Sequence, residues 1–301
     1  MKRKVCVVTG ACRGLGYATA LAFAKKGASV IMVCPMAKCG QDAAERIRVE
    51  SGNPYVDLYL TDLADLHQIR ALAISLMYVY PRIDVLVHNA ATFRHERTIS
   101  PDGYEYTFAV NYLAPFLLTH LLMPAMEQSF AARIISVADT SLMQGFVNLN
   151  DLQSTRHYKG HVAYRQSKLA SLMFIQELTQ RLNATRITAN CVSPGTITSD
   201  LIPDPSKLPW HMQVTHWLNR SFRQSPKEAC RYILNLALSP MLSDVKGTYY
   251  HQEEPVRFDR PLFKQADAKA LWETTEKMVA LTSSERILKW EAPNLSLWAL
   301  T

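Results

Sequence analysis

The sequence has no long uninterrupted apolar run and no cluster of basic residues. None of its apolar runs approaches the ~18 residues that a membrane-spanning helix needs, and the first run ends at Thr9-Gly10, too early for a secretory signal peptide. The 33 Lys and Arg residues give a net charge of +7, but they do not gather with aromatic residues, as a nucleic-acid-binding surface requires. We therefore expect a cytoplasmic protein without a nucleic-acid partner. Its positive charge fits a solvated surface, phosphate attraction or peripheral contact with an anionic membrane.

Cysteine is scarce and scattered. There are six cysteines in 301 residues, only Cys34 and Cys39 are near each other, and no pair of histidines completes a zinc-binding spacing. This pattern is typical of reduced thiols in a cytosolic compartment. The sequence predicts no metal site.

The first two-thirds of the chain alternates short apolar runs with longer helical patterns. Apolar runs without polar alternation are typical of strands buried on both faces, and helices between them imply a parallel sheet with right-handed crossovers. The sequence thus predicts an α/β fold, a doubly wound Rossmann sheet of seven parallel strands flanked by helices, in one catalytic domain over residues 1–301. The expected strands are residues 5–9, 29–33, 55–60, 83–88, 133–137, 185–192 and 247–251, and the expected helices residues 14–26, 41–50, 63–78, 104–126, 161–182, 226–238 and 267–282.

Two segments do not follow this alternation. Residues 203–225 contain three prolines followed by several aromatic side chains, which predicts an inserted helical loop. That loop is either a local cap on the core or a lid over an apolar substrate pocket. Residues 284–301 form a C-terminal tail with two tryptophans, which either packs on the domain or touches a partner or membrane surface.

A glycine-rich turn joins the first expected strand to the first helix. Gly10 permits the tight turn, while Gly14 and Gly16 allow backbone N–H groups to approach a pyrophosphate at the helix N-terminus, which carries a partial positive charge. Three glycines at this spacing are weak evidence alone. Here they lie between a strand and a helix, which is the context that dinucleotide binding requires.

Tyr164 and Lys168 lie four residues apart on one face of an expected helix. Hydride transfer to a carbonyl leaves an alkoxide that must take a proton, and a free tyrosine with a pKa of about 10 is a poor acid–base at neutral pH. A lysine one turn away, together with a positive nicotinamide ring, would lower that pKa. In isolation the pair also fits an ordinary amphipathic helix, but the glycine turn upstream favours the catalytic interpretation.

Together these motifs resemble the short-chain dehydrogenase/reductase family, and within it the retinol-dehydrogenase-like branch. The resemblance extends from residue 4 to about residue 280, and further motifs follow in the family's order. These are Asp62-Leu63 after the third strand, Asn89-Ala90 after the fourth, Asn111 in the long helix, Tyr164 with Lys168, and Pro194-Gly195-Thr196 after the sixth strand.

The resemblance implies a role for each of these positions. Asp62 and Leu63 would lie at the adenine, and Pro194, Gly195 and Thr196 along the nicotinamide, with Asn89 and Ala90 on the cofactor's path. Lys168 would also hold the nicotinamide ribose, and Asn111 would bind a water that links Lys168 to solvent. The family commonly forms dimers through the helices that carry Asn111 and Tyr164, so the resemblance also implies a homodimer.

The cofactor that the residues favour is NADP rather than NAD. Arg13, directly before Gly14-Leu15-Gly16, is a cation in the turn where a 2′-phosphate needs one. No Asp stands at residues 33–36 to bind a free ribose hydroxyl. Pro35 stands where the branch often has Arg, and Lys38 is a candidate to replace that missing cation.

One position departs from the family pattern. The family's catalytic serine falls two residues after the fifth strand, and Asp139 stands there. An ionised Asp accepts hydrogen bonds but donates none, so it would raise the pKa of Tyr164, and the lost donor would lower the rate by ~10²–10³. Two alternatives would restore a donor: Asp139 is protonated, or Thr140 or Ser141 supplies the hydroxyl. Ala91, in place of a glycine, adds a methyl group near the nicotinamide path.

Two functions follow from these residues. The first is an NADP-dependent oxidoreductase that interconverts a lipophilic alcohol and its carbonyl, such as a retinoid, steroid or polyprenol-like compound. Tyr164 would be the general acid/base, tuned by Lys168. The second is a nucleotide-binding scaffold or redox sensor that no longer turns over, which Asp139 and Ala91 favour. Because Tyr164, Lys168 and Asn111 are all present, the sequence favours the enzyme.

Overall fold

The computed structural model describes residues 3–197, 224–258 and 261–285. The expected lid at residues 203–225 lies outside the described residues except for Gln224 and Ser225. Of the expected tail at residues 284–301, only Ser284 and Glu285 are described. Neither segment's proposed role is therefore considered further.

Within the described residues, the centre of the fold is a sheet of eight strands, in the order β3-β2-β1-β4-β5-β6-β7-β8. Neighbours from β3 to β7 pair in parallel, and only β8 is antiparallel to its neighbour. The strands are β1 (Val5–Thr9), β2 (Ser29–Cys34), β3 (Val56–Leu60), β4 (Val85–His88), β5 (Arg133–Val137), β6 (Thr188–Ser193), β7 (Tyr249–His251) and β8 (Glu254–Pro255). The predicted doubly wound class is confirmed, but the predicted count of seven strands was wrong by one. The two residues of β8 carry no apolar pattern, and only their pairing with β7 shows the strand.

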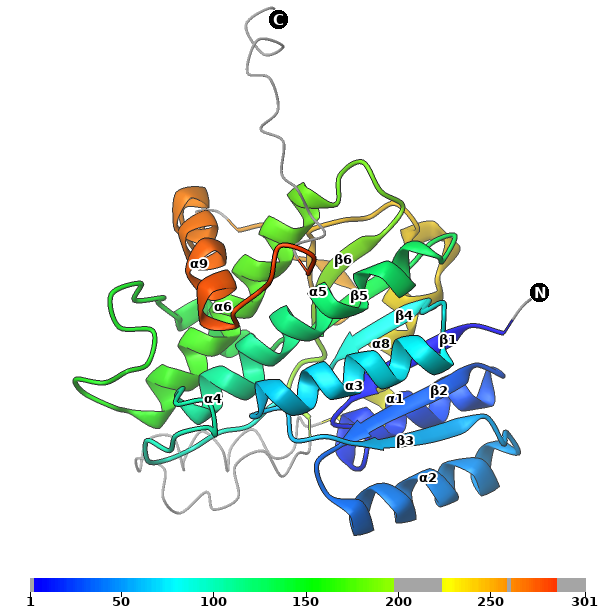
Figure 1. Ribbon diagram of the computed structural model, residues 1–301. Helices are drawn as coiled ribbons and strands as arrows, with labels where there is room; N and C mark the ends of the chain where they lie inside the picture. The colour runs from blue at the N-terminus through cyan, green and yellow to red at the C-terminus, as the bar shows by residue number, and fades with distance from the viewer. Residues whose placement is uncertain (1–2, 198–223, 259–260, 286–301) are drawn as a thin grey trace, which may run out of the picture.

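Helices cover both faces of this sheet (Figure 1). The helical segments are α1 (Gly14–Lys25), α2 (Ala37–Ser51), α3 (Leu66–Val79), α4 (Tyr106–Phe108), η1 (Ala109–Leu113), α5 (Ala114–Glu127), η2 (Thr140–Gln144), α6 (Gly160–Arg181), α8 (Pro226–Leu238), η5 (Pro240–Leu242) and α9 (Gln265–Met278). One buried cluster joins the sheet to α1, α2 and α8, and the other joins it to α3, α5, α6 and α9. This three-layer arrangement buries both faces of the central strands, as their uninterrupted apolar sequence predicts.

The expected long helix over residues 104–126 is not continuous. Its α-helical part is interrupted by the π-helical turn η1, which spans Ala109–Leu113 and contains Asn111. Single π turns inside α-helices shift the following side chains around the axis and occur often at functional sites. The apolar periodicity of the sequence does not distinguish this turn from regular helix.

This helical segment is also the part of the described chain that most resembles a membrane span. Tyr106–Glu127 has 22 residues and a mean hydropathy of 1.3, but 94% of its apolar window is buried within the fold. Its apolar residues face the sheet and the neighbouring helices α3 and α6. Here the hydropathy reflects a position in the core.

Helix α9 packs against α6, and its Trp272 is almost fully buried. The Trp272 ring contacts the rings of Phe116 and His120 on α5 at 4.9 Å and that of Phe174 on α6 at 5.8 Å between centroids. Aromatic side chains of this size contribute strongly to packing. The part of α5 and α6 that α9 covers is therefore not open to a second copy of the chain. A homodimer through these helices, which the family resemblance implies, would have to use their uncovered parts.

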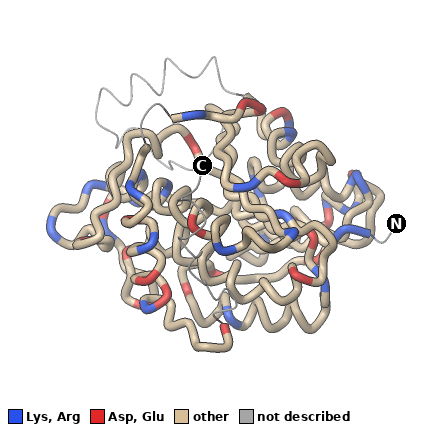
Figure 2. Tube along the Cα trace, turned by 90° about the horizontal axis from the view of Figure 1, so that it is seen from above, with Lys and Arg blue, Asp and Glu red and all other residues tan. Residues whose placement is uncertain are grey.

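The charge of the described chain is distributed over the molecule. In Figure 2, Lys and Arg segments alternate with Asp and Glu segments along the trace and do not form one broad basic face. Several cations are already paired, as in Lys25 with Glu50 and Arg181 with Glu177. This distribution of charge is typical of a solvated protein surface.

Candidate active site

The site begins where the order of the strands reverses. β1 and β4 are neighbours, while the chain runs from β1 outward to β3 on one side and from β4 outward to β8 on the other. In open α/β sheets this switch point leaves a crevice at the carboxyl ends of the strands, where ligands bind. The glycine turn follows β1, and Asn89-Ala90 follows β4. Both lie at this crevice.

Gly10 and Gly16 bring three backbone segments into close contact. Gly10 has φ +66°, and its N–H donates to the carbonyl oxygen of Val33 at 2.8 Å. A Cβ on Gly10 would lie 2.9 Å from Cα of Ala90, and one on Gly16 only 2.2 Å from the carbonyl oxygen of Gly10. Such distances are too short for a side chain. These two glycines therefore let α1 start directly over the ends of β1 and β4.

Thr9 and Asn89 fix this turn. The Thr9 hydroxyl accepts hydrogen bonds from the backbone N–H groups of Asn89 and Ala90, both at 3.0 Å. In return the Asn89 side-chain amide donates to the carbonyl oxygens of Thr9 at 2.9 Å and Gly10 at 3.3 Å. Asn89 thus positions the turn by joining β4 to β1. The part played by Thr9 was missed from the sequence, although a hydroxyl residue directly before the first glycine is a visible signal.

Arg13 and Lys38 stand exposed on either side of the glycine turn. Arg13 occupies the N-cap of α1, and Lys38 lies in the first turn of α2. The two segments touch, because the thiol of Cys39 lies 3.6 Å from the carbonyl oxygen of Cys12. In the described part of the chain neither cation forms an ion pair. By contrast Leu15, between Gly14 and Gly16, is buried in the core under α1, so its backbone alone can face a ligand.

The other expected cofactor positions lie along the same edge of the sheet. Asp62 follows β3, and its carboxylate accepts a hydrogen bond from the Ala64 N–H at 2.9 Å. The next residue, Leu63, is buried. Pro194-Gly195-Thr196 follows β6, and Gly195 adopts φ +82° with its N–H 3.4 Å from the Ser193 hydroxyl. The carboxyl ends of β1, β3, β4 and β6 thus carry the glycine turn and the three loops that the family resemblance places along a dinucleotide, while Lys168 lies on α6.

Tyr164 and Asp139 meet at the end of β5. Asp139 follows the strand by two residues, and one of its carboxylate oxygens accepts the hydrogen bond of the Tyr164 hydroxyl. The other oxygen accepts the Ser141 N–H at 2.8 Å and so caps the short helix η2. Asp139 therefore occupies the position expected from the family register, and both of its oxygens act as acceptors.

Lys168 extends toward β5 rather than toward the phenol. Its Nζ donates to the carbonyl oxygen of Val137 at 3.1 Å and lies 5.7 Å from the centre of the Tyr164 ring. Burial lowers the pKa of Lys168, and the charge of Asp139 partly opposes this effect. The expectation that Lys168 and a nicotinamide ring together lower the pKa of Tyr164 stays a prediction. Burial and then the adjacent Asp139 carboxylate raise the pKa of Tyr164 well above its usual value.

Asn111 reaches the site from the π turn. Its amide group donates to the carbonyl oxygen of Thr92 and to the hydroxyl of Ser167, both at 3.0 Å, and its side-chain oxygen accepts the Thr92 N–H at 2.8 Å. Both amide hydrogens are thus used within the protein. Only one lone pair of the side-chain oxygen remains for the water that the family resemblance places here.

Thr140 and Ser141, the two hydroxyl residues after Asp139, differ in their surroundings. Thr140 is exposed. The Ser141 hydroxyl oxygen is buried and has no hydrogen-bond partner in the described structure. An unsatisfied buried hydroxyl costs free energy unless something pairs with it, so Ser141 is the available donor in this loop.

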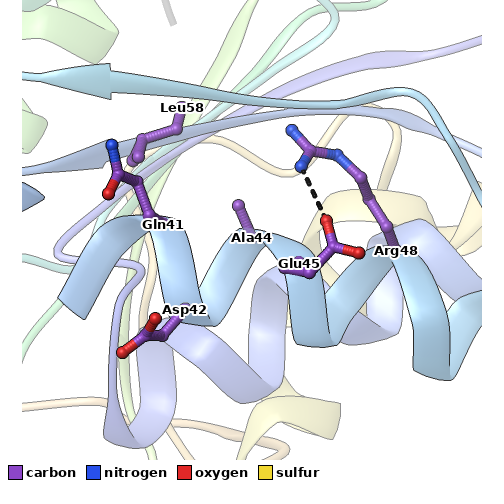
Figure 3. Close-up of a pocket in the computed structure, with 6 residues that line it drawn as sticks. All are labelled: Gln41, Asp42, Ala44, Glu45, Arg48 and Leu58. Atoms are coloured by element: carbon purple, nitrogen blue, oxygen red, sulfur yellow. Dashed lines mark hydrogen bonds and ion pairs between the residues drawn. The ribbon is translucent and has the colours of Figure 1, made fainter. Parts of the chain in front are cut away.

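A separate surface depression of about 370 Å³ lies between α2 and β3 (Figure 3). Its lining comes from the outer part of α2 and from Leu58 of β3, and the pair Arg48 and Glu45 crosses one side of it at 3.3 Å. Asp139, Tyr164 and Asn111 lie instead after β5, on α6 and in the π turn. The depression is therefore separate from this group of residues.

Comparison with known proteins identifies this fold and site. Residues 4–207 match the family described as short chain dehydrogenase. Relatives include retinol dehydrogenase 11 of Homo sapiens, 32% identical over 278 residues covering 92% of this chain and 86% of that protein. Another is retinol dehydrogenase 13 of Mus musculus, 35% identical over 288 residues covering 92% and 84%. The chain therefore belongs to the short-chain dehydrogenase family, in its retinol-dehydrogenase-like branch. It is an oxidoreductase that acts on CH–OH groups with a nicotinamide nucleotide as cofactor.

Solved structures agree in fold. An uncharacterised protein from Mycobacterium paratuberculosis superposes with a TM-score of 0.74 at 28% identity, covering 93% of this chain and 94% of that one. A metagenomic short-chain oxidoreductase in complex with NADP superposes with a TM-score of 0.61 at 22% identity, covering 82% and 96%. At the latter identity the likeness concerns the fold alone.

Proposed function

We propose that this chain is an NADP(H)-dependent oxidoreductase that interconverts a lipophilic alcohol and its carbonyl, with Tyr164 as the general acid/base. The observation that carries the proposal is the convergence of Tyr164, Lys168 and Asn111 at the carboxyl edge of a sheet that holds the glycine turn. NADP(H) supplies the hydride when it is bound. The protein's own residues hold it and move the proton.

Two exposed cations support NADP over NAD. Arg13 and Lys38 flank the contact between Cys12 and Cys39, where the second strand ends and a ribose 2′-phosphate of a dinucleotide on the glycine turn would lie. No carboxylate occupies residues 33–36 to bind a free 2′-hydroxyl. A phosphate between two cations forms charge-assisted hydrogen bonds.

For reduction, the Tyr164 proton goes to the substrate oxygen as the hydride arrives at carbon. Because the pKa of Tyr164 is raised, the phenol is protonated at neutral pH and is ready to donate. Its hydrogen bond to Asp139 must first be exchanged for one to the substrate. The Lys168 ammonium, close to the ring of Tyr164, would stabilise the phenolate that remains.

The Asp139 carboxylate should bind the alcohol substrate and the carbonyl substrate with different strength. A carbonyl oxygen can only accept a hydrogen bond, whereas an alcohol can also donate one to the Asp139 carboxylate. The carboxylate therefore binds the alcohol better than the carbonyl, and it opposes negative charge that develops on the substrate oxygen. Rotation of the unpaired Ser141 hydroxyl toward the substrate would supply the donor that Asp139 lacks.

The substrate class rests on the relatives. Retinol is named in both relatives described above, and Phe93 presents an apolar ring 5.9 Å from that of Tyr164. Peripheral contact with a membrane, where such substrates dissolve, is compatible with the chain's net positive charge.

A two-stage experiment tests the proposal. First, the purified chain is titrated with NADPH and with NADH, followed by nicotinamide fluorescence. Second, nicotinamide absorbance is followed with retinal, steroid ketones and long-chain aldehydes, and with acetaldehyde as a small polar control. We expect tighter binding of NADPH and turnover that rises with the apolar size of the substrate. Equal turnover of acetaldehyde and retinal would overturn the substrate class.

One observation favours a second function. The only described partner of the Tyr164 hydroxyl is an acceptor, Asp139, and this pairing holds the proton away from a substrate. In a scaffold or redox sensor, NADPH would bind as tightly, but the wild-type chain would reduce no carbonyl on the panel. If Asp139→Ser reduces a carbonyl that the wild-type chain does not, then Asp139 is the reason that the natural protein is inactive.

A further inference from the structure

Three cysteines from three elements of the fold lie together beside the glycine turn. Cys12 lies within the turn itself, Cys34 is the last residue of β2, and Cys39 lies in the first turn of α2. The thiol of Cys39 lies 3.6 Å from the carbonyl oxygen of Cys12, and all three thiols are reduced. The sequence suggested only that Cys34 and Cys39 are close. The topology adds Cys12, because the turn after β1 rests on the end of β2.

The three thiols differ in access and in acidity. Cys34 is fully buried, whereas Cys12 and Cys39 are partly exposed. The pKa of Cys12 is lowered to about 6, first by a hydrogen bond from the Cys34 thiol and then by those from Cys39 and by the charge of Arg13. The start of α1 adds a partial positive charge beside it. Burial and the neighbouring Cys12 raise the pKa of Cys39 to about 11.

We propose that Cys12 and Cys39 form a peroxide-sensitive thiol pair whose disulfide closes the phosphate-binding end of the cofactor site. The nucleophile is Cys12, because it is the accessible thiol with two neighbouring thiol donors and an arginine. Cys39 is the resolving thiol, since it is the only other accessible member of the cluster. Among the described residues no group of His, Cys, Asp and Glu is arranged to hold a metal ion, so redox chemistry is the use that remains for these thiols.

The chemistry balances with hydrogen peroxide as the oxidant. The Cys12 thiolate attacks one peroxide oxygen, the O–O bond breaks, and the departing hydroxide takes a proton to become water, leaving a sulfenic acid. The Cys39 sulfur then attacks the Cys12 sulfur, the S–O bond breaks, and the hydroxyl leaves with the Cys39 proton as a second water. Two thiols and one peroxide thus give one disulfide and two waters. Because Cys12 is uncharged as a sulfenic acid, it no longer raises the pKa of Cys39.

The consequence for the cofactor rests on the proposed NADP(H) site. A disulfide requires the sulfurs to approach to about 2.05 Å, which draws the glycine turn and α2 together. Arg13 and Lys38, adjacent to the two cysteines, would be drawn toward each other where a 2′-phosphate is expected. NADPH should therefore bind more weakly to the oxidised chain. By linkage, bound NADPH should shift the equilibrium from the disulfide toward the two thiols.

Tryptic peptides separate the three thiols and make the test direct. Cleavage after Lys and Arg places Cys12 together with the fully buried Cys6 in the peptide 5–13, Cys34 in 27–38 and Cys39 alone in 39–46, so fragment ions of the linked peptides distinguish Cys12 from Cys6. The reduced full chain is treated with one equivalent of hydrogen peroxide, alkylated, digested without reductant and analysed by mass spectrometry. We expect peptide 5–13 linked to peptide 39–46 through Cys12, with loss of the link in Cys39→Ser. Cys230→Ser, which alters a cysteine of α8 that is not one of the three clustered thiols, serves as the matched control and should keep the link.

The same samples are titrated with NADPH. We expect the dissociation constant to rise at least ~10-fold on oxidation and to return after treatment with dithiothreitol, and to stay constant in Cys39→Ser. Absence of the 5–13 to 39–46 link in the wild-type chain would overturn the thiol pair. A link that leaves NADPH affinity unchanged would overturn the closure of the site. If the reduced chain itself binds no NADPH, the proposed function fails and the closure with it, while the mass-spectrometric link is judged on its own.

Discussion

The Tyr164 hydroxyl donates its hydrogen bond to the carboxylate of Asp139. In the family that this chain resembles, the residue at position 139 is a serine, which can donate as well as accept. The carboxylate does not disturb the local fold, because its second oxygen caps η2 through the Ser141 N–H. The substitution therefore changes the chemistry of the site and keeps its architecture.

The Asp139 carboxylate should determine how the reaction depends on pH. Since the pKa of Tyr164 is raised well above 10, the phenol stays protonated from pH 6 to 9, and the rate of carbonyl reduction should be flat there. Alcohol oxidation needs the phenolate, whose fraction grows about tenfold for each pH unit below that pKa. In Asp139→Asn the rate of alcohol oxidation should stop rising at a lower pH than in the wild-type chain. The rate of carbonyl reduction should increase by up to ~10²-fold, because the Asn amide donates a hydrogen bond to the substrate oxygen.

The control for this variant is Asp57→Asn. Asp57 also accepts a tyrosine hydroxyl, that of Tyr80, but it lies on β3, away from the proposed chemistry. Its pH profiles should match those of the wild-type chain. Identical profiles for Asp139→Asn and the wild type would remove Asp139 from the account of Tyr164.

Arg13 should determine the choice of cofactor. Replacing it by alanine removes an exposed cation from the turn, so NADPH should bind about 10–100-fold more weakly while NADH changes by less than about 2-fold. Lys26→Ala removes the same charge at the opposite end of α1 and should leave both affinities unchanged. Dissociation constants from fluorescence titration decide the matter, and equal losses for NADPH and NADH would exclude Arg13 from phosphate binding.

Gly16 should tolerate no side chain. In Gly16→Ala the new Cβ would lie 2.2 Å from the carbonyl oxygen of Gly10 and 2.5 Å from the Asn89 amide nitrogen, so α1 must move off the turn. We expect a loss of roughly 2 kcal/mol or more in the free energy of unfolding, together with loss of dinucleotide binding. Gly52→Ala is the comparison, since its φ of +65° strains an alanine but its surroundings are open. That variant should lose about 1 kcal/mol and bind NADPH normally.

Two buried histidines should make the fold sensitive to acid. Burial lowers the pKa of His88 to about 3 and that of His120 to about 4, whereas both would titrate near 6.5 in the unfolded chain. Between these values the unfolded state binds more protons than the native state, so stability is full above pH 6.5 and falls as the pH decreases. From pH 7 to 5 each histidine should remove at most about 2 kcal/mol from the free energy of unfolding.

Urea unfolding at pH 7 and pH 5 measures this effect. His120→Gln should be less stable than the wild type at pH 7 but should show a smaller decrease on acidification. His67→Gln, which alters an exposed histidine at the start of α3, should follow the wild-type decrease. A decrease that is the same in all three chains would assign the acid sensitivity to other groups.

Much of this architecture could be predicted from the sequence because it depends on local signals. Uninterrupted apolar runs identified the parallel strands, and the glycine spacing identified the turn between β1 and α1. The position of Asp139 followed from its distance to β5, and the contact with Tyr164 agrees with that register. Each of these inferences needs only residues that are close together in the chain or in a fixed family order.

The features that escaped prediction depend on contacts between distant residues. The π turn at Asn111 has the same apolar periodicity as a regular helix. The approach of Cys12 to Cys39 depends on how β1 and β2 pair, and the cover that Trp272 forms over α5 and α6 depends on where α9 docks. The ammonium of Lys168 also donates to the Val137 carbonyl, a partner that no spacing rule specifies.

The most direct test of the central claim is the rate of NADPH oxidation by Tyr164→Phe with a substrate that the wild-type chain reduces. Tyr80→Phe removes a hydroxyl that is likewise bonded to a carboxylate but lies away from the site, and it serves as the control. We expect Tyr164→Phe to lose at least ~10³-fold in turnover while NADPH affinity stays within a few-fold and Tyr80→Phe remains active. Full activity in Tyr164→Phe would contradict the assignment of Tyr164 as the proton donor.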